Sequence, residues 1–151
     1  KKGELSLMDG IPAGMAELQR SVKLQKRARK AGFDWPSVEP VMDKFDEELL
    51  EMRTAMASGD RNAMEDELGD LLFVATNLAR KLDLDPGTAL RRSNAKFEQR
   101  FRAMENTVGG HAALETMGLD EQENLWQEVK RTAKREEGKQ GLTQTRVNNH
   151  E

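Results

Sequence analysis

The sequence predicts an all-α protein in which four to five helices pack as a bundle. No segment of useful length alternates between apolar and polar residues, as a half-buried strand would. Aromatic residues make up only 5% of the chain, and apolar residues recur instead at helical intervals of three and four. Because 36% of the 151 residues are hydrophobic and 34% are charged, we expect a small core. A second copy of the chain is expected to complete it, which predicts a homodimer.

The composition excludes several classes of partner. A net charge of −3 provides no overall field for nucleic acid or for anionic membranes, and we expect neither as a partner. The basic run from Lys23 to Lys30 has no aromatic residues between its cations, which favours a solvated helix face. The absence of cysteine rules out disulfides and thiolate metal sites. With no signal peptide and no apolar run long enough to cross a bilayer, a soluble, cytoplasmic chain is expected.

The N-terminal part predicts an arm followed by a first helix. Residues 1–12 contain two glycines and a proline and are expected to form a linker or arm. A helix is predicted over 13–30. Gly32 can adopt the left-handed conformation that ends a helix, and Pro36 suits the first position of the next one.

The second and third predicted helices have the clearest amphipathic patterns. They span about 37–57 and 62–82, and the sequence SGDRN separates them. In the second helix the apolar residues fall within roughly 100° on a helical wheel, and the third repeats this pattern. These residues are Val38, Val41, Met42, Phe45, Leu49, Met52 and Met56, then Met64, Leu68, Leu71, Ala75, Leu78 and Leu82.

The C-terminal part is predicted to hold two more helices and a tail. Asp85 is expected to cap a fourth helix. The inward face of this helix carries Leu90, Phe97, Phe101 and Met104. A loop over 106–118 precedes a short last helix, for which Asp120 and Glu123 suit a capping box. From Glu136 no apolar stripe remains, so residues 136–151 are predicted to be disordered and the folded domain to span 13–135.

Two pairs of carboxylates flank the apolar stripes of the second and third helices. Glu48 and Glu51 lie on adjacent turns of the second helix, and Glu67 and Asp70 occupy the equivalent flank of the third. The short connection between the helices favours antiparallel packing, which would bring all four acids together. Like charges repel strongly in a partly dry site. A divalent cation bound between them would remove this repulsion.

The type of ligand atom favours a hard cation. Oxygen ligands alone suit Mg²⁺, with Mn²⁺ as the second possibility. His111 and His150 lie outside these helices, which disfavours a di-iron site with Glu-x-x-His motifs.

Alternatively the acids are solvated groups paired with Lys and Arg, although two matching pairs make this the weaker interpretation. Glu47 points away from Glu48 and Glu51 on the same helix and is expected at the surface or beside the ligands. Asn77, on the flank of Asp70, could contact a ligand or cap a neighbouring group.

Cations on the fourth helix complement these acids. Lys96 and Arg100 are four residues apart and flank an apolar stripe. Beside a bound metal, such cations would neutralise the remaining oxygens of a polyphosphate. They could equally pair with acids of a neighbouring helix. Trp35 and Trp126 are expected to anchor the core or to pack on a nucleobase.

Several motifs resemble, in order and spacing, the MazG-type all-α nucleoside triphosphate pyrophosphohydrolases. "EELLE" (Glu47 to Glu51) followed by "ELGD" (Glu67 to Asp70) is similar to the Glu-Glu-x-x-Glu … Glu-x-x-Asp pattern of that family. Further stretches that look like this family are KLQKRARKAGFDWP, ELGDLLFVATNLARKL, ALRRSNAKFEQRFR and LWQEVKR. The resemblance covers roughly residues 11–135. The opening SLMDGIPAGM resembles the junction before the catalytic half of two-domain members, which implies that a first half is missing.

The resemblance implies roles for individual residues. The Mg²⁺ ligands of the family correspond to Glu48, Glu51, Glu67 and Asp70. Its polyphosphate-binding cations correspond to Lys96 and Arg100, and a tryptophan that helps to hold the nucleotide corresponds to Trp126. The four acids and two cations are the expected catalytic set. The family forms homodimers, in agreement with the small core.

The resulting hypothesis is a Mg²⁺-dependent hydrolase that cleaves an NTP or dNTP to the monophosphate and pyrophosphate. A metal-activated water would attack the α-phosphate, and Lys96 and Arg100 would stabilise the departing pyrophosphate. Two alternatives stay open: a narrower dUTPase- or dCTPase-like enzyme, and a non-catalytic helical dimerisation or regulatory module. The intact acidic motifs argue against the module. The MazG-like stretches outside the metal motif favour the broader substrate class.

Overall fold

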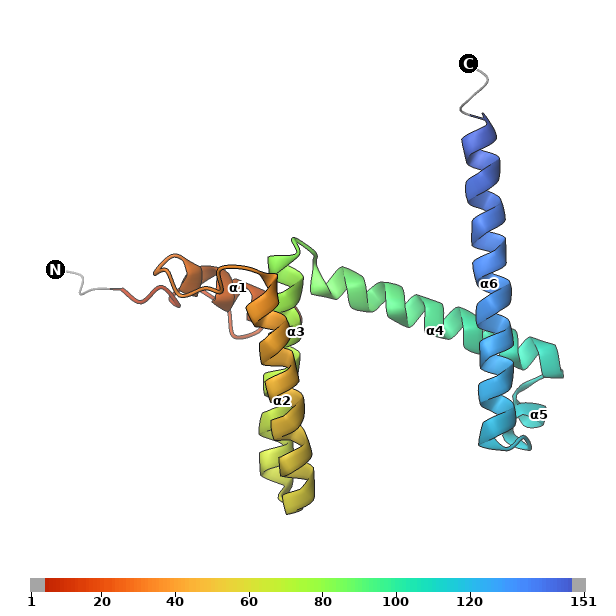
Figure 1. Cartoon of the computed structure of the whole chain (residues 1–151), viewed down its shortest axis with the longest axis horizontal. Helices are drawn as coiled ribbons and strands as arrows, with labels where there is room; N and C mark the ends of the chain where they lie inside the picture. The colour runs from red at the N-terminus through yellow and green to blue at the C-terminus, as the bar shows by residue number, and fades with distance from the viewer. Residues whose placement is uncertain (1–4, 148–151) are drawn as a thin grey trace. The chain divides into compact units, whose positions relative to one another are not determined.

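The computed structural model describes residues 5–147, and their side chains as far as Leu142 (Figure 1). This part of the chain contains six helices and no strand, which confirms the predicted all-α class. The helices are α1 (Glu17–Arg29), α2 (Val38–Ser58), α3 (Arg61–Lys81), α4 (Pro86–Val108), α5 (His111–Glu115) and α6 (Leu119–Val147). None of these described helices has the length and apolar character that a membrane span needs.

The chain divides into two compact units within α4. One unit ends at Arg91 and the other begins at Arg92. The domain predicted over 13–135 includes parts of both units, and its bounds remain a prediction.

The first unit is built on the antiparallel pair of α2 and α3, with α1 packed against α3 (Figure 1). The turn between α2 and α3 uses residues suited to it. Gly59 ends α2 in the left-handed conformation, with φ of 71°. Asp60 then caps α3, because its carboxylate accepts a hydrogen bond from the backbone N–H of Asn62 at 3.0 Å. This short connection places α2 beside α3, as the sequence predicts.

The helix α1 is shorter than predicted and is tied to the N-terminal arm. It begins at Glu17, because the residues just before it, including Gly14, form a turn in which the Met15 N–H donates to the Pro12 carbonyl oxygen. It is followed by Gly32, which has the predicted left-handed conformation with φ of 83°. The Arg27 guanidinium donates to the carbonyl oxygens of Leu7 and Asp9, both at 3.0 Å. The predicted arm is therefore held against α1 by these two hydrogen bonds.

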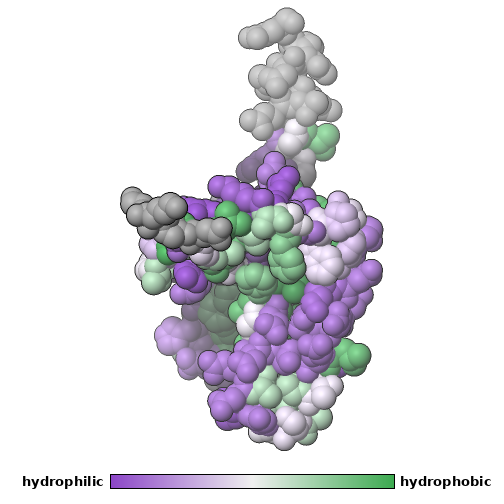
Figure 2. Space-filling model, turned by 90° about the vertical axis from the view of Figure 1, so that its left-hand side faces the viewer, coloured by the Kyte–Doolittle hydropathy of each residue, from purple (hydrophilic) through white to green (hydrophobic). Residues whose placement is uncertain are grey.

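The apolar stripe of α2 and α3 is only partly buried. Val41, Ala55 and Val74 lie in the core, whereas Leu49 and Leu68 are 47% and 50% exposed. Other large apolar residues of this region also reach the surface, namely Met42, Leu50, Met56, Leu72, Phe73 and Leu82. On the face drawn in Figure 2, hydrophobic side chains (green) are exposed between hydrophilic ones (purple). The small core agrees with the composition.

A network of buried and partly buried polar groups joins α1 and the loop after it to the end of α3. The Arg80 guanidinium pairs with the Asp34 carboxylate. It also donates to Oε1 of Gln25 at 3.4 Å and to Oδ1 of Asn77 at 2.7 Å. Lys81 adds a second cation, with its Nζ 3.1 Å from Asp34. The Arg80 and Asp34 side chains are only 6% and 14% exposed, so the pair is largely shielded from water.

This network makes the stability of the first unit sensitive to acid. Hydrogen bonds from Arg80, and after them from Lys81, hold the pKa of Asp34 well below its usual range. A depressed pKa stabilises the folded state above the unfolded pKa of about 4, and this stabilisation is lost as the pH falls below it. We therefore expect the Tm, followed by circular dichroism, to drop between about pH 5 and about pH 3 more steeply in the wild type than in Asp34→Asn. Equal slopes would show that Asp34 is not responsible.

The second unit contains the remainder of α4 together with α5 and α6. Met104, Leu114 and Leu125, one from each helix, form its core. The side chains packed against this core are Val108, Met117, Trp126 and Val129. The helix α5 lies in the stretch predicted as a loop. Its five residues are too few to show a periodic pattern in the sequence.

The helix α6 is much longer than predicted. The sequence predicts disorder from Glu136, whereas the helix continues to Val147. No proline interrupts this segment, and its Glu, Lys, Gln and Arg residues favour helix even without an apolar stripe. Asp120 lies in the first turn of α6, and not before the helix where a capping box requires it. Residues 1–4 of the predicted arm and 148–151 of the predicted tail lie outside the described residues.

Candidate functional site

Three of the four predicted metal-binding acids converge between α2 and α3. Carboxylate oxygens of Glu48, Glu67 and Asp70 all lie within 4.8 Å of one another, and we call these three residues the carboxylate cluster. Glu48 of α2 is buried, with 4% of its surface exposed. On α3, Glu67 is partly buried and Asp70 is exposed. The cluster therefore opens from the edge of the core to the surface, and its role as a ligand set remains a prediction.

Glu51 lies beside the carboxylate cluster, at an exposed position one turn after Glu48. The pKa of Glu67 is raised, first by burial and then by interactions with Glu51. The charges of Glu48 and Asp70 raise it further. Glu67 thus feels the charges of the other three predicted ligands, and the repulsion expected from their spacing is present at this residue.

Two oxygens of the cluster are buried without a hydrogen-bond partner among the described residues. They are Oε2 of Glu48 and Oε2 of Glu67. A buried carboxylate oxygen without a donor is unfavourable, and each such atom calls for an explanation. A divalent cation coordinated by these oxygens would supply the missing partner. The purely oxygen ligand set fits a hard cation such as Mg²⁺.

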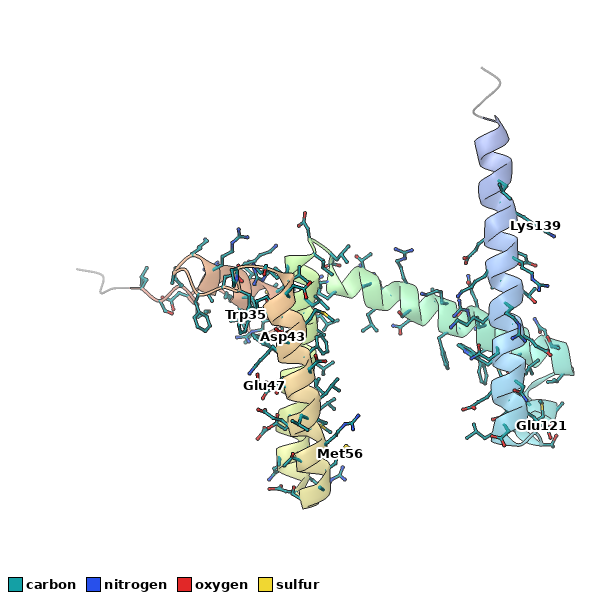
Figure 3. All side chains as sticks on the ribbon, viewed as in Figure 1. Trp35, Asp43, Glu47, Met56, Glu121 and Lys139 are labelled. Carbon is teal, nitrogen blue, oxygen red and sulfur yellow. The ribbon has the colours of Figure 1, made fainter. Side chains whose placement is uncertain are left out.

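Lys44 neutralises part of the negative charge of the cluster. Its Nζ lies 3.2 Å from Oε1 of Glu48 and 3.1 Å from Oε1 of Glu47. Hydrogen bonds to Glu47 and then to Glu48 raise the pKa of Lys44. Glu47, labelled in Figure 3, lies at the surface, one of the two locations that the sequence allows. The sequence analysis does not identify the ion pair between Lys44 and Glu48, although their spacing of four residues on one helix is the signal for such a pair.

Metal binding is expected to stabilise the protein. A ligand at a hundredfold excess over its Kd adds about 2.7 kcal/mol to the free energy of unfolding. We expect MgCl₂ to raise the Tm, measured by differential scanning fluorimetry, above that in KCl of equal ionic strength. Glu48→Gln should reduce this rise, because it removes one ligand charge. No Mg²⁺-dependent shift in the wild type would contradict the assignment of a metal site.

The predicted substrate-binding residues lie in the second unit. The Arg100 guanidinium carbon is 5.9 Å from the centroid of the Trp126 ring, a cation–π distance. The ring of Phe97 packs on the same tryptophan, with 5.4 Å between centroids. Trp126 is therefore fixed between an aromatic ring, a cation and the core of this unit. Phe97 was not identified as a site residue, although its spacing of three residues from Arg100 places both on one helix face. Trp35 lies in the loop before α2 (Figure 3).

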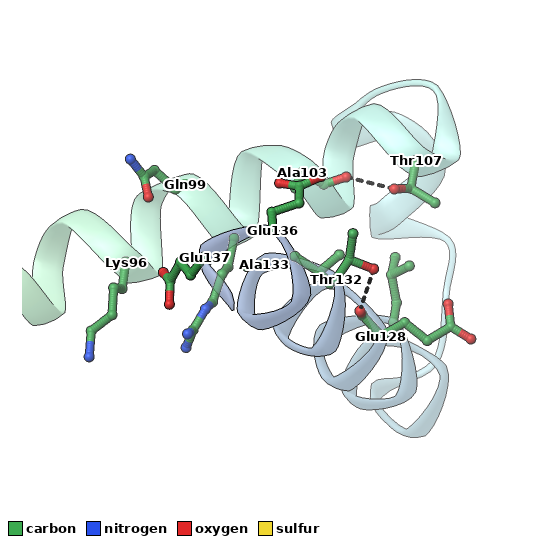
Figure 4. A pocket seen from close by; sticks show the side chains of 12 residues that line it. Lys96, Gln99, Ala103, Thr107, Glu128, Thr132, Ala133, Glu136 and Glu137 are labelled. Carbon is green, nitrogen blue, oxygen red and sulfur yellow. Dashed lines mark hydrogen bonds between the residues drawn. The ribbon is translucent and has the colours of Figure 1, made fainter. Parts of the chain in front are cut away.

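Lys96 and Arg100 also line a groove of about 460 Å³ between α4 and α6 (Figure 4). The acids that line it are Glu128, Glu136 and Glu137. The hydroxyl of Thr132 donates to the Glu128 carbonyl oxygen at 3.1 Å, as Figure 4 shows. Charges of both signs therefore face this groove.

Comparisons with known proteins point to one family. The sequence profile of the MazG nucleotide pyrophosphohydrolase domain matches residues 37–104. A nucleoside triphosphate pyrophosphohydrolase of Escherichia coli (strain K12) is 42% identical over an alignment of 137 residues, which covers 87% of this chain and 51% of that protein. A protein of Thermotoga maritima named nucleoside triphosphate pyrophosphohydrolase/pyrophosphatase MazG is 37% identical over 114 residues, 75% of this chain and 44% of that protein. The chain spans about half the length of these curated relatives. The profile match includes all four acids, Lys96 and Arg100, and Trp126 lies beyond it.

Proposed function

The chain belongs to the MazG nucleotide pyrophosphohydrolase family, and from this premise we propose that it hydrolyses nucleoside triphosphates to monophosphates and pyrophosphate. The observation that carries the proposal is the carboxylate cluster. Its oxygens approach within 4.8 Å of one another, and two of them are buried without a partner among the described residues. Such a site is suited to a divalent cation that also binds phosphate oxygens.

We assign the metal to Glu48, Glu51, Glu67 and Asp70, with Mg²⁺ as the ion and Mn²⁺ as its substitute. When bound, the ion would neutralise phosphate oxygens and lower the pKa of a coordinated water. The four acids would hold this ion in place. A carboxylate oxygen of the set that does not coordinate the ion can accept the proton of the water that attacks the α-phosphorus.

Lys96 and Arg100 are assigned to the polyphosphate. Their charges stabilise the negative charge that develops on the departing pyrophosphate. Trp126 is assigned to holding the nucleotide. The contact of the Trp126 ring with the Arg100 guanidinium supports a second role for Trp126, which is to restrain this guanidinium. A restrained guanidinium loses less conformational freedom when it binds phosphate.

We assign a homodimer and a cytoplasmic location to the chain. The exposed leucines Leu49, Leu50, Leu68 and Leu72 support the dimer, because a second chain could cover apolar surface that a single chain leaves exposed. We expect light scattering after size exclusion to give twice the chain mass of 17.0 kDa. A mass of 17.0 kDa at micromolar concentration would contradict the dimer.

The cytoplasmic location is supported by the lack of cysteine, because a chain without disulfides suits a reducing compartment such as the cytoplasm.

The reaction is tested by product analysis of ATP and dCTP incubated with this chain, with and without Mg²⁺. Monophosphate and pyrophosphate are the expected products, and they should form only with the metal. Diphosphate and inorganic phosphate would contradict the assigned position of attack. No turnover in a folded chain would favour the dimerisation or regulatory module.

Substrate breadth separates the proposal from a narrower enzyme. We expect kcat/KM values of the same order across several nucleotides. A strong preference for dUTP or dCTP would favour the dUTPase- or dCTPase-like alternative.

A further inference from the structure

Asn77 lies on α3, on the same flank as the carboxylate cluster and seven residues after Asp70. At the rise of an α-helix, this spacing separates the two residues by roughly 10 Å along the axis. Asn77 is buried, with only 8% of its surface exposed. A buried amide is unfavourable unless its donors and acceptor have partners, so the partners of Asn77 indicate what it does.

The network around Arg80 fixes the orientation of the Asn77 amide. The Asn77 Oδ1 accepts a hydrogen bond from Arg80 at 2.7 Å, and the same guanidinium is held by Asp34 and Gln25. A guanidinium only donates hydrogen bonds, so the amide must direct its oxygen toward Arg80. Its nitrogen then points the other way and cannot exchange places with the oxygen.

The amide nitrogen of Asn77 has no hydrogen-bond partner among the described residues, and it is not enclosed either. The enclosed side-chain atoms without a partner in this part of the chain are Nε of Arg20 and the Oε2 atoms of Glu48 and Glu67. The amide nitrogen is therefore in contact with solvent although most of the residue is buried, and its N–H donors remain available. Other positions on this flank provide no uncharged donor, because Val74 is apolar and Lys81 is paired with Asp34.

We infer that Asn77 donates a hydrogen bond to an acceptor oxygen on the nucleoside part of the substrate and so helps to determine specificity. This inference rests on the proposed function, in which the acids anchor the phosphates through the metal. A nucleoside attached to those phosphates extends over a distance comparable to that between Asp70 and Asn77. The acceptor is a sugar hydroxyl or a base carbonyl, both of which accept hydrogen bonds from an amide.

Two variants of Asn77 test this inference with CTP, which carries both kinds of oxygen. Asn77→Asp keeps an acceptor for Arg80 but has no amide donor, and Asn77→Ala removes both. We expect each to lower kcat/KM for CTP about five- to tenfold, the effect of one hydrogen bond to a neutral acceptor. The inhibition constant of Mg²⁺-tripolyphosphate, which has no nucleoside, should stay unchanged in Asn77→Ala. Asn62→Ala, an exposed amide on the same helix, is the matched control and should change neither value.

A second substrate, ATP, shows whether the acceptor oxygen belongs to the sugar or to the base. If it belongs to the sugar, ATP should lose as much as CTP in Asn77→Ala. If it belongs to the base, ATP should be unaffected, because adenine has no carbonyl. An equal loss for CTP and tripolyphosphate would overturn the inference, because it would show a merely structural role. If the wild type binds neither ligand with Mg²⁺, the proposed function fails and the inference fails with it.

Discussion

Replacement of Glu67 by glutamine is expected to lower kcat/KM for nucleotide hydrolysis by at least about a hundredfold at low Mg²⁺. Glu67 contributes a buried, unpartnered oxygen to the carboxylate cluster, and a neutral amide is a poor ligand for a hard cation. The loss should diminish at high Mg²⁺, because weaker metal binding can be offset by concentration. The measurement is initial-rate kinetics of pyrophosphate release over a titration of MgCl₂.

The same substitution should leave the fold intact. Glu67 faces the like charges of Glu48, Glu51 and Asp70, so removing its charge relieves repulsion in the metal-free protein. We expect the Tm in EDTA to be unchanged or higher. Glu65→Gln is the matched control, because Glu65 is exposed on the same helix and outside the carboxylate cluster. Wild-type turnover of Glu67→Gln at low Mg²⁺ would refute the site.

Replacement of Arg80 by leucine is expected to lower the free energy of unfolding by about 3 kcal/mol. The Arg80 side chain is 6% exposed, and its removal leaves Asp34 with fewer donors in a largely dry location. Lys81 retains its contact with Asp34, which limits the loss. Urea denaturation followed by circular dichroism measures the change.

The control for this prediction is Arg61→Leu. Arg61 is the exposed first residue of α3, so its substitution should change the free energy of unfolding by less than about 0.5 kcal/mol. If Arg80→Leu were as mild as this control, the buried network would not stabilise the first unit. If the loss of unfolding free energy in Arg80→Leu were intermediate and the double variant Arg80→Leu/Asp34→Asn recovered it, the unpaired Asp34 carboxylate would be the cause.

The sequence was sufficient to predict the features that depend on local patterns. The bounds of α2 and α3 follow from their apolar periodicity and from the glycine and aspartate between them. The convergence of Glu48, Glu67 and Asp70 follows from the same helical geometry once the helices are antiparallel. These predictions needed only residues that are close in sequence and one short turn.

Features that depend on distant or weak signals were not predicted. Arg80 pairs with Asp34, which lies 46 residues earlier in a loop, and no periodicity connects them. Phe97 of α4 packs on Trp126 of α6. These two helices are connected by the short helix α5, whose five residues show no periodic hydrophobic pattern, so their packing could not be predicted. The continuation of α6 past Glu136 depends on intrinsic helix propensity alone, which is a weak signal beside an absent apolar stripe.

The ion pair between Lys44 and Glu48 has a consequence for how the proposed metal would be exchanged. Lys44 is a resident counterion on the same helix, so part of the negative charge stays compensated when no ion is bound. Small zinc domains, by contrast, unfold when their ion leaves. An ion at the proposed site could therefore depart and return without loss of the helix pair. It would then behave as a co-substrate that arrives with the nucleotide and leaves with the pyrophosphate.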